Sequence, residues 1–200
     1  MPMAVINARF RGKRRDGPQL PPGQYLTTDF PVLQIGTTPR VLTDRWSLSV
    51  TTPDGQGHRW TWREFLDLPQ SEFTVDIHCV TRWSKLATTW KGVTVDTLLD
   101  AAGATGVGTH VMAHSSDGYT TNMPMADLVG GQAMVAHTFD GKPLAPEHGG
   151  PARLVVPHLY FWKSAKWVSE LHLLDGDEPG FWERNGYHMY GDPWLEQRYG

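Results

Sequence analysis

The chain has 200 residues, of which 40% are hydrophobic and 20% charged, and its formal net charge is −3. This length suits one domain, and the slightly negative charge gives no electrostatic footprint for binding nucleic acid. The single cysteine excludes an internal disulfide, and no apolar run approaches the length of a membrane span. No signal peptide is evident, and we expect a cytoplasmic protein.

The first 24 residues are basic and rich in proline and glycine. They predict an extended, solvated arm, followed by one domain over residues 25–200 that ends in an aromatic tail at 175–200. The apolar segment FPVLQIG, within residues 25–39, is expected to dock on this domain.

Alternating apolar residues and turn signals then predict short elements in chain order. Trp46, Leu48 and Val50 alternate as in a strand, and Thr61 with Glu64 has the spacing of a capping box that begins a helix. Helices are further expected at 94–102, where Gly103 caps the helix, and at 125–129; strands are expected at 109–114, 134–139, 153–157 and from 167. This mixture without βαβ regularity favours an α+β fold with mixed β-sheets and short helices.

The stretch Ser71–Trp83 contains the only cysteine of the chain, Cys79. Its apolar residues fall on every second position, as in a half-buried strand, and Cys79 ends that row before a polar loop containing Arg82 and Lys85. Nearby cations lower the pKa of a thiol, so Cys79 is a candidate thiolate. The alternative is a buried, inert cysteine that fills space.

The segment 147–167 combines cations with exposed backbone donors. Gly149-Gly150-Pro151 brings the backbone in without side chains, and Arg153, Lys163 and Lys166 follow. Such a set can bind phosphate, although these cations could also solvate a hairpin. The chain has no Walker loop, no GxGxxG and no recognised zinc-site spacing among its nine histidines.

Four motifs carry a family likeness: HCVTRWS at 78–84, GVTVDTLLDAAG at 92–103, HSSDGYTTNMPMADL at 114–128 and DGKPLAPEHGGPARLVVPHLYFWKSAKWVSEL at 140–171. In order and spacing, the chain resembles the molybdopterin-binding catalytic domain of the sulfite oxidase superfamily. It is most similar to the small bacterial members and to the catalytic subunit of periplasmic methionine sulfoxide reductases.

The resemblance implies a molybdenum–molybdopterin cofactor with Cys79 as the protein ligand of the metal. A soft thiolate suits such a sulfur-rich site. The segment around Phe30, Leu33 and Gln34 is expected to close over the cofactor. The implied contacts to the pterin and phosphate are Ser115, His148, Arg153, Ser164, Ala165 and Lys166.

Differences from the family leave the substrate open. His78 precedes the cysteine where the periplasmic reductases have arginine, and His148 replaces a common asparagine. The chain is too short for the haem and dimerisation domains of vertebrate-type sulfite oxidases. We therefore expect no haem, a monomer, and a separate electron-transfer partner.

The predicted function is two-electron oxygen-atom transfer on a small molecule, either a sulfite-like oxyanion or an S-oxide. Arg82 is the candidate for binding an oxyanion, because a guanidinium matches its geometry. For Trp83 and Tyr119 ordinary packing is an equal alternative. The residues expected at the catalytic centre are Cys79, His78, Arg82, Trp83, Asp117 and Tyr119. The alternative function is a non-catalytic α+β domain that binds an anion or a partner protein, with a structural Cys79.

Overall fold

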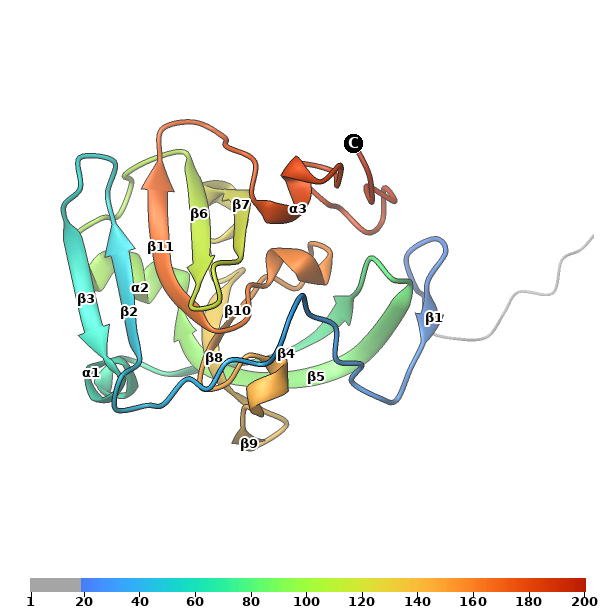
Figure 1. Cartoon of the computed structure of the whole chain (residues 1–200), viewed down its shortest axis with the longest axis horizontal. Helices are drawn as coiled ribbons and strands as arrows, with labels where there is room; N and C mark the ends of the chain where they lie inside the picture. Colours follow the sequence, from blue (N-terminus) through green and yellow to red (C-terminus); the bar gives the residue numbers. More distant parts are fainter. Residues whose placement is uncertain (1–18) are drawn as a thin grey trace, which may run out of the picture.

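Two β-sheets carry the fold of residues 19–200, the residues that this computed structural model describes (Figure 1). The six-stranded sheet contains β1 (Tyr25–Leu26), β4 (Ser71–His78), β5 (Trp83–Thr94), β8 (Met134–Phe139), β9 (Lys142–Pro143) and β10 (Arg153–Val155). The five-stranded sheet has the order β3 (Gly57–Thr61), β2 (Ser47–Thr51), β11 (Val168–Leu174), β6 (His110–Ser115) and β7 (Thr120–Pro124). Most strand pairs are antiparallel, and β2–β11 and β1–β5 are parallel.

The helices are short. They are α1 (Trp62–Asp67), α2 (Val95–Ala101) and α3 (Phe181–Arg184), with 3₁₀ turns η1 (Met125–Asp127), η2 (Pro146–His148) and η3 (Phe161–Lys163). The predicted α+β class is confirmed. The capping box of α1 is also present, because the Thr61 side chain accepts from Glu64 N–H and the Glu64 carboxylate accepts from Thr61 N–H at 2.8 Å.

The main core contains apolar side chains from both sheets. Leu48 and Val50 of β2 are fully buried, as their alternation predicted, and Leu171 and Leu173 of β11 lie in the same cluster. Ile77, Cys79 and Trp83 belong to a second, smaller cluster beside it. The cysteine therefore lies at the rim of a packed region.

Strand β5 corrects the sequence prediction. Residues 81–85 were expected to form a loop, but the strand begins at Trp83, which is buried, and continues to Thr94. Its sequence, WSKLATTWKGVT, has no clean alternation because β5 pairs with β1, β4 and β8 and bulges at Lys91/Gly92. Strands β3 and β7 were missed for a similar reason, since the first is mostly polar and the second is short.

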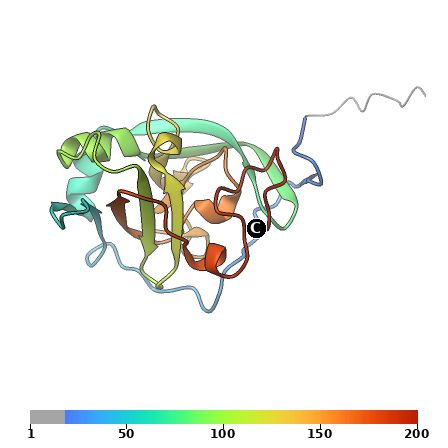
Figure 2. The same cartoon turned by 90° about the horizontal axis from the view of Figure 1, so that it is seen from above.

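Gln24 and Arg198 both contact the turn that contains Cys79. Residues 1–18 of the predicted arm lie outside the described residues, but Pro21 is buried and Gln24 Nε2 donates to Cys79 O at 3.0 Å. The end of the predicted arm therefore packs on the domain. Seen from above, the C-terminal segment in red also lies at this end of the molecule (Figure 2).

Candidate active site

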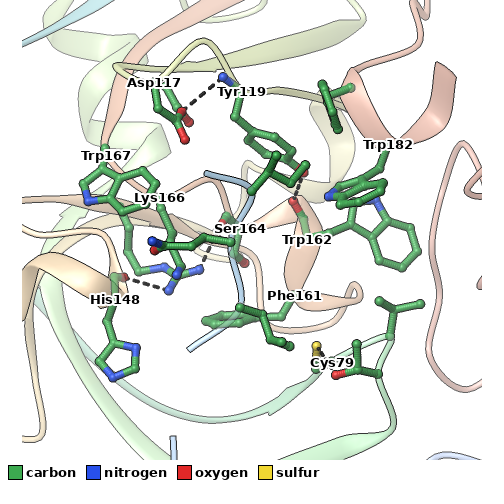
Figure 3. A pocket seen from close by; sticks show the side chains of 18 of the residues that line it. Cys79, Asp117, Tyr119, His148, Phe161, Trp162, Ser164, Lys166, Trp167 and Trp182 are labelled. Atoms are coloured by element: carbon green, nitrogen blue, oxygen red, sulfur yellow. Dashed lines mark hydrogen bonds between the residues drawn. The ribbon is translucent and has the colours of Figure 1, made fainter. Parts of the chain in front are cut away.

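A cavity of about 440 Å³ lies where segments from both sheets meet (Figure 3). Ser115, at the end of β6, and Cys79, just after β4, bring one residue from each sheet to its wall. The residues that line it come from 30–35, 79–83, 115–119, 148–153, 161–167 and 181–187. This convergence brings together most of the predicted site.

A tight turn fixes Cys79 at this wall. Its N–H donates to Trp83 O at 2.9 Å, and its carbonyl accepts from Arg82 N–H at 3.0 Å. The side chain is 7% exposed, and Thr81 Oγ1 donates to Sγ at 3.1 Å. Burial raises the pKa of the Cys79 thiol above its ordinary value, and the Thr81 hydrogen bond opposes this only in part.

The cation that lowers the pKa of the Cys79 thiol is not the one that the sequence predicted. Arg82, expected to activate Cys79, is exposed, has φ of +78° and does not line the cavity. Arg198 instead donates to the carbonyls of Val80 and Pro22, and its charge lowers the Cys79 pKa against the effect of burial. Sequence reasoning missed Arg198, which lies in the last three residues with no local motif.

Arg153 forms the core of the predicted anion site. It is 1% exposed, and its guanidinium donates to His148 O at 2.9 Å and to Ser164 O at 2.6 Å. Burial lowers its pKa to about 9, so it keeps its charge at neutral pH. For Arg153 the alternative of a cation on a solvated hairpin is therefore wrong.

Lys166 lies next to Arg153 in the same cavity. Its Nζ donates to Glu147 O at 2.6 Å, and burial, assisted by the charge of Arg153, lowers its pKa to about 8. Gly149, with φ of +105°, allows this close packing, since a Cβ there would lie 3.0 Å from Lys166 Cα. Two concentrated positive charges thus face one cavity.

His148 contributes a neutral ring. It stacks on Phe30 with centroids 3.8 Å apart and planes 3° apart, and burial lowers its pKa to about 4. Its Nδ1 and the Ser115 Oγ are buried without a hydrogen-bond partner within residues 19–200. Because buried polar atoms are nearly always paired, a polar ligand in the cavity would satisfy them.

The other predicted site residues divide into two groups. The cavity is lined by Phe30, Leu33, Gln34, Trp83, Asp117, Tyr119, Ser115, His148, Arg153, Ser164 and Lys166. His78, Arg82 and Ala165 are not among the lining residues. The ring of His78 is buried and its Nδ1 lies 2.8 Å from Ser84 Oγ, so it contributes to packing beside Cys79.

Lys163 was expected to belong to the anion-binding cations, but it is fully buried and its Nζ pairs with Glu183 Oε1 at 2.6 Å. Six aromatic residues that sequence reasoning did not assign to the site also line the cavity: Phe161, Trp162, Trp167, Phe181, Trp182 and Tyr187. The signal for Phe181, Trp182 and Tyr187 was the density of aromatic residues in the tail, and the other three lie in the motif at 140–171.

The cavity fits a pterin-bound molybdenum. Figure 3 shows the Cys79 sulfur on the side of Trp162 and Trp182, and His148 and Lys166 on the other side. A thiol suits the metal, and buried cations suit a phosphate. Within residues 19–200 no three His, Cys, Asp or Glu side chains form a group that could hold a metal ion alone.

The fold of residues 19–200 is of the sulfite oxidase type. The fold is similar to the sulfane dehydrogenase SoxCD of Paracoccus pantotrophus, with a TM-score of 0.64 over 74% of this chain and 42% of that chain. At 21% identity this likeness concerns the fold alone.

Residues 35–182 match the oxidoreductase molybdopterin binding domain, and the chain belongs to this family. The predicted membership of the sulfite oxidase superfamily is confirmed, and the protein is a molybdenum-dependent oxidoreductase.

Two relatives give the scale of the similarity. The chain is 42% identical to the uncharacterized oxidoreductase YuiH of Bacillus subtilis over 95% of this chain and 98% of that protein. It is 31% identical to the putative protein-methionine-sulfoxide reductase subunit YedZ1 of Azospira oryzae. The matched region covers 67% of this chain and about half (51%) of that relative. Among the helices of residues 19–200, none has the length and apolar character needed to cross a membrane.

Proposed function

We propose that the protein catalyses two-electron oxygen-atom transfer on a small substrate at the cavity beside Cys79. The observation that supports this proposal most is the pairing of one buried thiol with the Arg153–Lys166 cation pair across a single cavity. When bound, a molybdenum–pterin cofactor supplies a metal centre that exchanges two electrons. The electrons are exchanged with a separate partner.

The residues of this chain bind and shield that group. Cys79 holds the metal, while Arg153 and Lys166 neutralise the phosphate and Ser115 donates to the pterin. Phe30 and His148, stacked at the rim, exclude water from the cavity. Tyr119 donates its hydroxyl to Trp162 O at 2.7 Å and so fixes the wall between the two ends.

The substrate is a sulfite-like oxyanion or an S-oxide. The relative YedZ1 is named a putative protein-methionine-sulfoxide reductase subunit, and this supports an S-oxide for the chain that resembles it. Three further predictions concern the protein as a whole: it is a monomer, it contains no haem, and it is located in the cytoplasm. Light scattering, the visible absorption spectrum and cell fractionation test these three predictions.

Cofactor analysis of the purified protein, made in a host that synthesises molybdopterin, tests the proposal. We expect about one molybdenum and one pterin per chain. Lys166→Met should lower the pterin content, whereas Lys142→Met, at an exposed position, should leave it unchanged. A folded protein that contains neither metal nor pterin would contradict the proposal.

A further inference from the structure

The turn that carries Cys79 contains a residue in a backbone conformation that favours glycine. Arg82 has φ of +78°, and its N–H donates to Cys79 O at 3.0 Å, while Cys79 N–H donates to Trp83 O at 2.9 Å. A residue other than glycine in the left-handed region costs free energy and persists only where surrounding contacts hold it. The turn over residues 79–83 therefore depends on contacts from outside it.

Two side chains from distant parts of the chain hold the carbonyls of this turn. Gln24 Nε2 donates to Cys79 O at 3.0 Å, and Arg198 Nη1 donates to Val80 O. Cys79 and Val80 line the cavity, whereas neither Gln24 nor Arg198 does. The two donors thus support the wall that carries the sulfur from outside the cavity.

Arg198 is itself held in one geometry. It is 8% exposed, its Cζ lies 4.9 Å from the centre of the Tyr160 ring, and its Nη2 donates to Pro22 O at 3.4 Å. Its own carbonyl accepts from His188 N–H at 3.3 Å, which pairs this part of the C-terminal segment with the residues after α3. Because a planar guanidinium has its donors in a fixed fork, an arginine fixed in this way can also fix the carbonyls that it contacts.

No ion pair among residues 19–200 explains the burial of Arg198. The two ion pairs there join His158 to Asp127 and Lys163 to Glu183. A buried cation without a carboxylate is unfavourable unless its hydrogen bonds compensate, and those of Arg198 are directed to the backbone of the turn and of the N-terminal segment. Stability alone does not account for this arginine.

We propose that Arg198 is a positioning residue of the active site. Together with Gln24 it holds the 79–83 turn so that the sulfur of Cys79 faces the cavity before any cofactor binds (Figure 3). A ligand that is already in place loses less conformational freedom when it binds, and residues that orient a metal ligand commonly change metal affinity 10- to 100-fold. The inference rests on the proposed function, because it takes Cys79 as the ligand.

Hydrogen exchange of the metal-free protein, followed by mass spectrometry, tests the turn directly. Arg198→Met removes both donors, so exchange in the peptide over 79–83 should become about tenfold faster relative to a reference peptide over 110–115 in β6. Arg198→Lys keeps the charge and a donor and should fall between. The matched control is Arg184→Met, an exposed arginine of the same segment that donates to Pro179 O at 2.6 Å, and it should leave the turn unchanged.

The loaded protein gives a second measurement, the rate at which molybdenum is released on dilution into a chelator. Arg198→Met should release it about tenfold faster than the wild type, Arg198→Lys should restore part of the retention, and Arg184→Met should resemble the wild type. Gln24→Glu, which places an acceptor against Cys79 O, should resemble Arg198→Met. The thiolate-to-molybdenum absorption band should shift in Arg198→Met and Gln24→Glu, because it depends on the orientation of the sulfur at the metal.

The outcomes separate the positioning role from the proposed function. A wild type without molybdenum would overturn the proposed function, and the exchange of the 79–83 peptide would still decide whether Arg198 holds the turn. Exchange in this peptide that Arg198→Met leaves unchanged, or that it accelerates equally in the reference peptide, would overturn the positioning role. Molybdenum release from Arg198→Met as slow as from Arg184→Met would overturn it as well. Circular dichroism verifies folding, and if Arg198→Met does not fold, Arg198→Lys and Gln24→Glu carry the same comparison.

Discussion

Cys79 combines two properties that oppose each other in the free protein. Burial raises the pKa of its thiol, yet its position on the cavity wall suits a metal ligand. In the proposed complex a bound metal would resolve this conflict, because a thiol ligand must lose its proton and the metal replaces it. The raised pKa thus belongs to the metal-free thiol.

Replacing Cys79 with serine should abolish cofactor binding through the metal. A hydroxyl is a harder and more weakly ionised ligand, so we expect the molybdenum content of Cys79→Ser to fall below about a tenth of the wild-type value, with activity lost. Thr81→Val, which removes only the hydrogen bond to the sulfur, should retain molybdenum. Metal analysis of both variants tests this expectation. A serine variant with the molybdenum content of the wild type would refute the assignment of Cys79 as a ligand.

His148 should make the stability of the metal-free protein depend on pH. Burial holds its pKa at about 4 in the folded state, against 6.5 for the free side chain. Between these pH values the unfolded chain therefore binds more protons than the folded one. The contribution of His148 to the free energy of unfolding is fully present above about pH 6.5 and is lost as the pH drops toward 4. In His148→Asn this part of the loss should disappear.

Urea unfolding at several pH values measures this difference. His58→Asn, at an exposed position of β3, is the control and should follow the wild type. Equal acid sensitivity of the wild type and His148→Asn would show that His148 is already charged in the folded protein.

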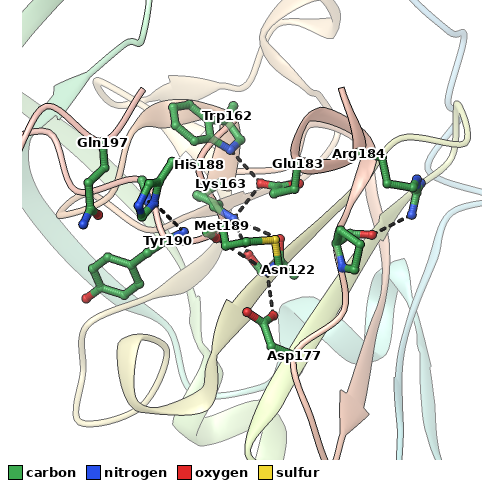
Figure 4. A network of polar contacts seen from close by, with 12 residues as sticks. Asn122, Trp162, Lys163, Asp177, Glu183, Arg184, His188, Met189, Tyr190 and Gln197 are labelled. Carbon is green, nitrogen blue, oxygen red and sulfur yellow. Dashed lines mark hydrogen bonds and ion pairs between the residues drawn. The ribbon is translucent and has the colours of Figure 1, made fainter. Parts of the chain in front are cut away.

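At the scale of elements, the Lys163–Glu183 pair joins η3 to α3 and so attaches the C-terminal segment to the cavity wall. Lys163 Nζ also donates to Asn122 O and Met189 O, at 2.8 and 2.6 Å (Figure 4). The removal of one partner leaves a buried charge without compensation, and this is more costly than the loss of the pair itself. The pair is thus the main polar attachment of α3.

Lys163→Met should lower the free energy of unfolding by about 3–5 kcal/mol. Lys142→Met, at an exposed site on β9, should change it by less than about 0.5 kcal/mol. Chemical denaturation measures both values, and a loss as small as that of the control would mean that the pair contributes little to attaching α3.

At the scale of the whole molecule, the cavity ties distant parts of the chain together. Its lining residues extend from Phe30 to Tyr187 and include residues from both sheets. A ligand that binds only when these segments are assembled stabilises the entire fold by mass action.

Removal of the cofactor should therefore lower the melting temperature. At a ligand concentration of about 1,000 Kd the stabilisation is about 4 kcal/mol, which corresponds to a shift of roughly 10 °C for a chain of this size. Scanning calorimetry of loaded protein, metal-free protein and Cys79→Ser measures the shift, and the last two should agree. Identical melting temperatures with and without cofactor would contradict a site built from both sheets.

The sequence by itself determined the local features. The alternation of Ser71–Cys79 predicted β4 and placed the thiol just beyond it, and the Thr61–Glu64 spacing predicted the start of α1. The family motifs also indicated most of the cavity lining, because those residues lie within or next to contiguous motifs. Such features depend on neighbours a few positions apart, where hydrophobic period and capping chemistry act directly.

Only the tertiary structure decided which charges and rings meet. Arg198 lies near Cys79 and Arg82 does not line the cavity, although Arg82 is three residues from the cysteine and Arg198 is at the end of the chain. Similarly, Lys163 and Lys166 are close in sequence, but one is buried against Glu183 and the other lines the cavity. The physical reason is that burial and long-range strand pairing, rather than composition, determine the partner of each side chain.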